Sequence, residues 1–309
     1  MGAKNAADFR HHASAGTVIY GGVFAPFCLA VLLARPVPAS PFPVTVEPAS
    51  VRQGSYAVVM AVVAEDSGTV GVLDRTFPLY RVNGASASRN AGETPSLRGG
   101  LRALIPVPLA TPPGRKEMVV RVSGRTVRLT LVVERRAGEK PQKLSSLTVD
   151  DKRAMAMKED RGEMLAVLKK TGGTALWTGP LRVPIMGRIS AVFGQKRVYG
   201  GGASWFHSGV DFAMPKGWPI MAAAPGRVAM AGMVSSYGNC VVLDHGQTVH
   251  TVYMHMSKLL VKAGERVNEG QIIGLVGDTG LALGPHLHFS AYITTVPVDP
   301  LEFLERGLP

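Results

Sequence analysis

The sequence predicts a mainly β protein built from two folded units. Glycine and proline are frequent, at 36 and 22 of 309 residues, as expected of a chain with many turns. Apolar runs of strand length alternate with turn residues over most of the chain, whereas helical periodicity is confined to one segment. A chain of 309 residues is also longer than a single hydrophobic core usually serves. We therefore expect two β domains and a connecting segment.

The first 39 residues have the features of an export signal. Lys4 and Arg10 precede an uncharged stretch at residues 16–34, and the small-residue stretch 37–39 follows. This order is typical of secretory signals, with cleavage at the end of the small-residue stretch. The uncharged stretch is also nearly long enough to span a bilayer, so retention as an anchor stays open. We expect residues 1–39 to act as a signal peptide or a single membrane anchor and to place the chain in the periplasm or cell envelope.

Cysteine usage excludes a disulfide framework. Cys28 lies within the export segment, which leaves Cys240 alone in the rest of the chain. A lone cysteine cannot form an internal disulfide, so we expect the fold to depend on its cores, with Cys240 buried in a strand.

Residues 42–134 are expected to form a β-sandwich. Runs with strand character occur at 55–64, 118–122 and 126–133, and turn signals such as Asn83-Gly84 separate them. No cluster of histidines, cysteines or carboxylates accompanies these runs. We therefore expect this domain to position the protein and not to carry chemistry.

Residues 135–183 are expected to be a polar linker that contains one helix. Asp150 and Asp151 can open a helix whose apolar positions include Met157 and Leu168, and Gly172-Gly173 can end it.

The net charge of +12 is concentrated in the front part of the chain. Residues 1–183 hold 25 Lys and Arg against 14 Asp and Glu, or +11, while residues 184–309 hold 9 against 8, or +1. Such an excess favours contact with anionic polymers or a membrane surface. Aromatic and basic residues are not interleaved as in nucleic-acid binders, so we expect no nucleic-acid partner. The oligomeric state is not indicated.

Residues 184–309 predict an all-β domain that holds the chemistry. Strand-like runs separated by glycine occur at 226–233, 239–244, 250–254, 272–276 and 286–293. Six of the eight histidines of the chain fall in this part.

Three spacings among these polar residues matter. In His207-Ser-Gly-Val-Asp211 and in His286-Leu-His288 the separation is even, so in extended chain the two polar side chains point to one face. The sequence Tyr253-Met-His255 has the same property. Imidazole and carboxylate are zinc ligands, and a catalytic zinc needs only three protein ligands with water in the fourth position. Each spacing alone is weak, but together they predict a catalytic zinc site.

The chain also resembles a known family at these residues. Segments such as His207-Ser-Gly-Val-Asp-Phe-Ala213, Tyr253-Met-His255 and Gly284-Pro-His-Leu-His-Phe289 are similar to the motifs of lysostaphin-type or LytM-type zinc endopeptidases, metallopeptidase family 23, which cleave peptidoglycan peptides. The resemblance spans about residues 184–303. It implies a LytM-type antiparallel β-sheet with a duplicated hybrid motif. The front domain looks like the immunoglobulin-like module that precedes the peptidase in some members.

The resemblance also implies roles for five residues. His207, Asp211 and His288 would bind one Zn2+, and His255 and His286 would be the catalytic pair. One of the pair would take a proton from water and the other would stabilise the oxyanion, and the sequence does not say which does which. The expected function is hydrolysis of peptide bonds in the stem or cross-link peptides of peptidoglycan. The alternative is a catalytically silent groove that binds and regulates another cell-wall hydrolase. A lipoyl-like carrier is disfavoured because no lysine stands in a carrier-like setting.

Several other residues complete the expectations. Tyr199, Trp205 and Tyr237 lie near the motifs and are candidates to bind substrate. Metal-bound imidazoles need partners on their outer nitrogens, for which Asp244 and Asp299 are candidates. His245 and His250 flank a turn at Gly246-Gln247, and we expect both to be exposed and without a role.

Overall fold

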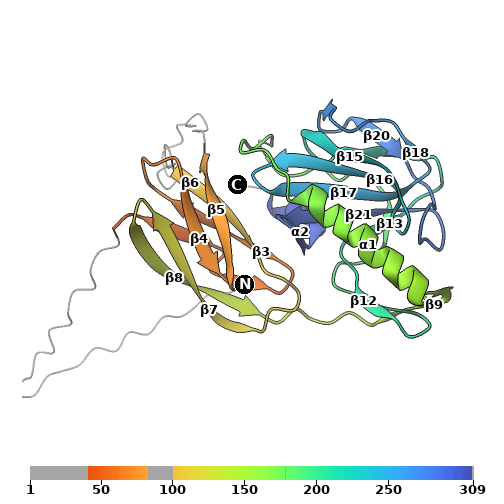
Figure 1. Ribbon diagram of the computed structural model, residues 1–309, viewed down its shortest axis with the longest axis horizontal. Helices are drawn as coiled ribbons and strands as arrows, with labels where there is room; N and C mark the ends of the chain where they lie inside the picture. The colour runs from red at the N-terminus through yellow and green to blue at the C-terminus, as the bar shows by residue number, and fades with distance from the viewer. Residues whose placement is uncertain (1–40, 83–99, 178, 308–309) are drawn as a thin grey trace, which may run out of the picture. The chain divides into compact units, whose positions relative to one another are not determined.

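The computed structural model describes residues 41–82, 100–177 and 179–307, which belong to one compact unit. The predicted export signal and the predicted turn at Asn83-Gly84 lie outside the described residues. Strands dominate the described part, which confirms a mainly β fold (Figure 1). No helix in these residues is both long and apolar enough to cross a membrane.

The first eight strands form one sheet in the order β1-β3-β6-β5-β4-β7-β8-β2, folded around its own core. Strand β5 links the two parts of this sheet, because residues 75–79 pair with β4 and residues 80–82 pair with β6. Alternation fixes which side chains enter the core: on β7, Met118 and Val120 are buried and Arg121 is exposed. The predicted β-sandwich region is thus a β domain with a single core, and its immunoglobulin-like character stays a prediction. The strands are β1 (Val44–Glu47), β2 (Ser50–Arg52), β3 (Tyr56–Ala61), β4 (Gly68–Val72), β5 (Arg75–Val82), β6 (Gly100–Pro106), β7 (Gly114–Val122) and β8 (Arg125–Glu134).

A second sheet of eight strands carries His245, His250, His255, His286 and His288. Its order is β10-β13-β21-β17-β16-β15-β19, with β22 paired to β21, and every pair is antiparallel. The central strands are almost wholly buried, because other elements cover both faces. Cys240 lies fully buried on β16, as expected. The strands are β10 (Arg188–Ala191), β13 (Val210–Ala213), β15 (Gly226–Val234), β16 (Gly238–Gly246), β17 (Val249–Met256), β19 (Arg266–Val267), β21 (His286–Ile293) and β22 (Val296–Val298).

Two small sheets complete the strands. The strands β14 (Pro219–Met221), β20 (Ile272–Leu275) and β18 (Lys258–Leu259) pair in that order. The hairpin β11 (Lys196–Gly200) and β12 (Ser204–Phe206) pairs through β11 with β9 (Gln142–Thr148). The pairing of β9 with β11 is parallel and was not expected, because the sequence predicted only a helix in the linker.

The predicted linker helix is α1 (Asp151–Leu168). Asp150 caps it by accepting a hydrogen bond from the backbone N–H of Arg153 at 2.8 Å. Met164 and Leu168 pack against a face of the second sheet that includes Val242 and Met254. Figure 1 shows α1 running across the strands of this sheet. The helix is therefore a fixed part of the second β region and not a free connector.

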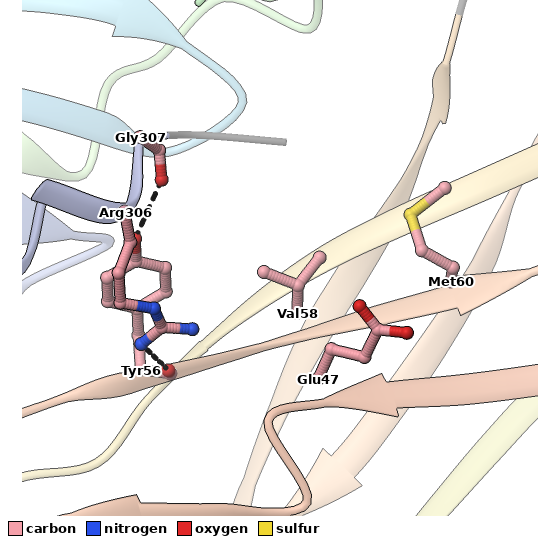
Figure 2. Close-up of a pocket in the computed structure, with 6 residues that line it drawn as sticks. All are labelled: Glu47, Tyr56, Val58, Met60, Arg306 and Gly307. Carbon is pink, nitrogen blue, oxygen red and sulfur yellow. Dashed lines mark hydrogen bonds between the residues drawn. The ribbon is translucent and has the colours of Figure 1, made fainter. Parts of the chain in front are cut away.

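The second helix, α2 (Pro300–Arg306), contacts the first sheet. Figure 2 shows Arg306 stacked on Tyr56 of β3, with the guanidinium carbon 4.6 Å from the ring centroid. The Tyr56 hydroxyl donates to the Gly307 carbonyl at 2.9 Å, and Glu302 accepts from Ser55 and from Arg52. The small pocket beside these residues, about 210 Å³, contains no histidine.

Candidate metal centre and catalytic site

Strand register brings Asp211 and His288 face to face. The two residues are direct partners on the adjacent strands β13 and β21, and Asp211 Oδ1 lies 2.9 Å from His288 Nδ1. His207 stands just before β13, and its Nε2 lies 3.0 Å from Asp211 Oδ1 and 2.9 Å from His288 Nδ1. All three side chains are buried. The three residues that the resemblance implied as metal ligands therefore converge on one point.

Gly209 allows the loop between His207 and Asp211 to cross β21 closely. A Cβ atom on Gly209 would lie 2.4 Å from the Phe289 carbonyl oxygen and 2.8 Å from His288 Nε2. Only glycine fits such an approach without displacing the ligand strand. Gly209 thus allows His207 and Asp211, which lie on either side of it, to stand close to His288 on β21.

Backbone and hydroxyl groups orient the two ligand imidazoles. His207 Nδ1–H donates to the Val192 carbonyl at 2.9 Å, which leaves the Nε2 lone pair for a metal. His288 Nε2 lies 2.8 Å from Ser290 Oγ, and when that hydroxyl accepts the Nε2 proton, Nδ1 is left for the metal. The expectation that Asp244 and Asp299 supply these partners is wrong. Asp244 binds Thr171 and the Gly172 N–H, whereas Asp299 binds Arg136 and caps α2.

The geometry of the three atoms fits zinc. Ligands at about 2.05 Å around a tetrahedral ion stand roughly 3.3 Å apart, so the separations of 2.9 to 3.0 Å need only a slight expansion. Burial alone would raise the pKa of the Asp211 carboxyl, but its hydrogen bonds with His207 and His288 hold that pKa well below the usual range. Burial lowers the pKa of His288 to about 4. A charged carboxylate and a neutral imidazole are the forms that bind a metal.

The remaining two motif histidines face this centre. The rings of His255 and His286 are 4.7 Å apart, and His255 lies 6.1 Å from the His288 ring. His286 Nε2 is 3.9 Å from Asp211 Oδ1. His286 Nδ1–H donates to the Gly284 carbonyl and His255 Nδ1–H donates to the Thr279 carbonyl, each at 2.8 Å. Each ring therefore keeps its Nε2 for chemistry.

His255 reaches the site by a route that strand alternation does not predict. Tyr253 pairs with Phe289 and lies in the core on the opposite face, where its hydroxyl accepts from the Ala223 N–H at 2.8 Å. His255 has a left-handed φ of 64°, which turns its ring away from that core and toward His286. The expectation that Tyr253 and His255 share one face is wrong, because the strand leaves regular geometry between them.

His255 is held as a neutral imidazole. Burial, followed by the nearby charges of His286 and His288, lowers its pKa to about 3. A neutral ring with a free Nε2 can accept a proton at neutral pH.

Arg197 was missed by the sequence analysis. Its guanidinium donates to Asp211 Oδ2, the oxygen that does not face the two ligand histidines, while its Nε donates to the Gln142 side chain of β9 at 3.0 Å. The contact holds the carboxylate so that Oδ1 points to the metal centre. No spacing signal could have identified it, because Arg197 lies on a separate hairpin and looks like a solvated strand residue in sequence.

A groove of about 740 Å³ opens over this centre. Tyr199, Trp205 and Tyr237, the candidates for substrate binding, all line it. Tyr199 and Trp205 pack edge to face with ring centroids 5.2 Å apart. Their position in the groove that also contains His207 and His288 is suited to contact a peptide.

His245 and His250 lie elsewhere and are not exposed, contrary to expectation. Both side chains are fully buried. His245 Nδ1–H donates to the Pro225 carbonyl and its Nε2 lies 2.7 Å from Thr251 Oγ1, while His250 Nε2–H donates to the Lys170 carbonyl. The turn at Gly246-Gln247 is covered by residues of the linker, which the sequence did not indicate.

Comparison with known proteins agrees with this geometry. A family model described as Peptidase family M23 matches residues 205–300, the segment that holds all five site residues. The chain is 46% identical over 96 residues to the peptidoglycan DD-endopeptidase ShyA of Vibrio cholerae, covering 31% of this chain and 22% of the relative. It is 41% identical over 115 residues to the DD-carboxypeptidase/endopeptidase Mpg of Neisseria meningitidis serogroup B, covering 37% and 26%.

The match to a solved structure is more extensive. A crystal structure of a protein from Pseudomonas aeruginosa assigned to peptidase M23 superposes with a TM-score of 0.62 at 26% identity, covering 82% of this chain and 94% of the other. The curated relatives, in contrast, are matched over only about a quarter of their own length. Residues 205–300 thus match peptidase family M23 in sequence, and the same residues hold the paired strands and the centre of His207, Asp211 and His288.

Proposed function

We propose that this protein is a zinc metalloendopeptidase that hydrolyses peptide bonds in peptidoglycan. The observation that carries the proposal is the complete site: three converging ligands, with His255 and His286 beside them, each offering a free Nε2. The names of the similar proteins of Vibrio cholerae and Neisseria meningitidis support a D,D-peptide bond as the bond cleaved. Action on this polymer belongs to the cell envelope, with export through residues 1–39.

His207, Asp211 and His288 would hold the metal, one ion per chain. A bound zinc ion would supply a Lewis acid that acidifies water and polarises the scissile carbonyl. The nearby His255 and His286 would handle protons. One Nε2 takes a proton from the attacking water and delivers it to the leaving amine, and the other, when protonated, donates to the oxyanion.

The division of labour between these two rings follows from their surroundings. His255 is the more deeply buried of the two, and its low pKa favours the neutral form that accepts a proton. His286 is less buried, and its Nε2 lies 3.9 Å from Asp211 Oδ1 at the metal centre. We therefore assign proton acceptance to His255 and donation to the oxyanion to His286.

The decisive experiment measures the release of peptides from cross-linked peptidoglycan by the zinc-loaded wild-type protein and by the zinc-loaded His255→Asn variant. Asparagine tolerates the left-handed backbone of residue 255 but cannot act as a base. We expect mass spectrometry to detect uncross-linked peptides released by the wild type, and the variant to lose about 100-fold to 10,000-fold in rate while keeping its zinc. Unchanged turnover of His255→Asn would contradict the assigned mechanism.

The same experiment addresses the silent-groove alternative. A protein that binds zinc and peptidoglycan but releases no peptide at any zinc concentration would be a binding module and not an enzyme. Completeness of the site favours the enzyme, because a groove used only for binding has no need for five polar side chains that converge on one point.

The basic front half is proposed to hold the enzyme near anionic wall polymers or a membrane surface. Exposed cations such as Arg115, Arg121 and Arg128 lie along β7 and β8. The measurable sign is binding to intact walls that weakens as salt concentration rises. Binding that is independent of salt would contradict this role.

A further inference from the structure

The groove over the metal centre is bounded by α1, outside the segment that matches the family model. Six residues of α1 line the groove. Each lies three residues or one residue after the one before it, so all six are on one face of the helix. They are Ala154, Met157, Lys158, Arg161, Met164 and Leu165. The linker helix is therefore one wall of the catalytic groove.

A buried hydrogen-bond pair fixes α1 relative to the catalytic histidine. Asp160, which is 8% exposed, accepts from the backbone N–H of Ser236 at 2.7 Å and from its hydroxyl at 2.6 Å. The next residue, Tyr237, accepts the backbone N–H of His255 through its carbonyl at 2.9 Å. Two links thus connect the helix to His255, so groups on α1 stand at a defined position along the groove.

Two cations occupy the groove face of α1 without a carboxylate partner. Lys158 and Arg161 are three residues apart, a separation at which like charges destabilise a helix. The residues three or four positions away from either are Ala154, Met155, Met157, Gly162, Met164 and Leu165. None can form an ion pair, and within the described residues neither cation has a salt bridge.

The rest of the groove lining does not compensate this charge. No Asp or Glu is among the described residues that line it, whereas Arg197 adds a third cation. Arg197 is already paired with Asp211, so Lys158 and Arg161 are the cations left over. Burial raises the pKa of both Tyr237 and Tyr292, and the charge of Arg161 acts against that effect, which places the guanidinium near these two groove residues.

We propose that Lys158 and Arg161 bind a free carboxylate of the peptide substrate and so select substrates that carry one near the scissile bond. The proposal rests on the proposed peptidase function, because the occupant of this groove is taken to be the peptide that reaches the metal centre. Stem peptides carry free carboxylates, and a guanidinium can hold a carboxylate through two parallel hydrogen bonds. The like-charge pair on α1 is then relieved when substrate binds.

Binding of an uncleaved peptide tests the proposal directly. Two synthetic stem peptides are compared by calorimetry on zinc-loaded His255→Asn protein, one with every carboxylate free and one with every carboxylate converted to a carboxamide. We expect Arg161→Gln, added to this background, to weaken binding of the free-carboxylate peptide about tenfold. The fully amidated peptide should bind both proteins with affinities within about twofold of each other.

A matched control removes one positive charge from the same helix but away from the groove. Lys152 is exposed in the first turn of α1 and does not line the groove, so Lys152→Gln should leave both affinities unchanged. The proposal would be overturned if Arg161→Gln weakened binding of both peptides equally, or weakened binding of neither. It would also be overturned if the His255→Asn protein without the Arg161 substitution bound the two peptides equally well.

These outcomes are separable from failure of the proposed function. If the wild type releases no peptide from peptidoglycan but Arg161→Gln selectively weakens the free-carboxylate peptide, the peptidase function is wrong and the carboxylate site stands. If the wild type cleaves peptidoglycan but Arg161→Gln weakens neither peptide selectively, the peptidase function stands and the carboxylate site is wrong.

Discussion

Two groups of histidines lie in or beside the same sheet, and they differ in how their ring nitrogens are used. His255, His286 and His288 of β17 and β21 meet His207 around one point, and each keeps one nitrogen directed at that point. His245 lies on β16, and both of its nitrogens have partners, the Pro225 carbonyl and the Thr251 hydroxyl. All of these rings are buried except that of His286, which is partly exposed. A nitrogen directed at one shared point is what distinguishes the site histidines from His245.

The strongest test of this difference is metal content. His288→Ala removes one of three ligands, so we expect purified protein to lose its stoichiometric zinc and all measurable cleavage. His245→Gln should keep about one zinc ion per chain, as a single site requires. Elemental analysis after dialysis measures both variants. Full zinc occupancy in His288→Ala would show that the two groups are not divided as the geometry indicates.

The structural group should be visible in the pH dependence of stability. Burial lowers the pKa of His245 from 6.5 to about 4, so between these values the unfolded chain binds the proton more readily. The contribution of neutral His245 to the free energy of unfolding is fully present above pH 6.5. It is lost as the pH falls from 6.5 to 4, and the total loss is about 3 kcal/mol. Urea unfolding of metal-free protein at several pH values measures it. His245→Gln should show a correspondingly shallower loss, and identical slopes would contradict this account.

A smaller effect is expected from the group that supports the metal centre. Arg197→Gln removes the cation that holds Asp211 Oδ2, so zinc affinity should fall about 10-fold to 100-fold. The matched control is Arg128→Gln, which removes an exposed arginine paired with Glu117 on the first sheet and should leave affinity unchanged. Competition with a zinc chelator gives both values. Equal affinities for Arg197→Gln and wild type would mean that the two ligand histidines alone position the carboxylate.

Much of the site could be predicted because its motifs are local. The strand at residues 286–293 was expected at the bounds that β21 has, and the period of a strand is enough to put His286 and His288 on one face. The face of His255 could not be predicted, because it depends on a left-handed residue within β17. Histidine at φ > 0 is uncommon, and nothing in Tyr253-Met-His255 signals it.

Long-range contacts explain the other differences. Asp244 and Asp299 were expected, from their charge, to bind the outer nitrogens of the ligand imidazoles. The actual partners are the Val192 carbonyl for His207 and the Ser290 hydroxyl for His288. A backbone carbonyl has no signature in the sequence. His245 and His250 looked exposed beside a turn because the linker that covers them is far away in sequence. Helix α1 was correctly located, yet its place along the groove depends on the buried contact between Asp160 and Ser236.

The parallel pairing of β9 with β11 has a consequence for excising the catalytic unit. A fragment that began at residue 184, the boundary suggested by composition, would lack β9 and would leave the hairpin of Arg197 with an open strand edge. It would also lose Gln142, which holds the Arg197 guanidinium, and the helix that walls the groove. A fragment that keeps this groove intact therefore starts upstream of Gln142, well before residues 205–300, which match the family model.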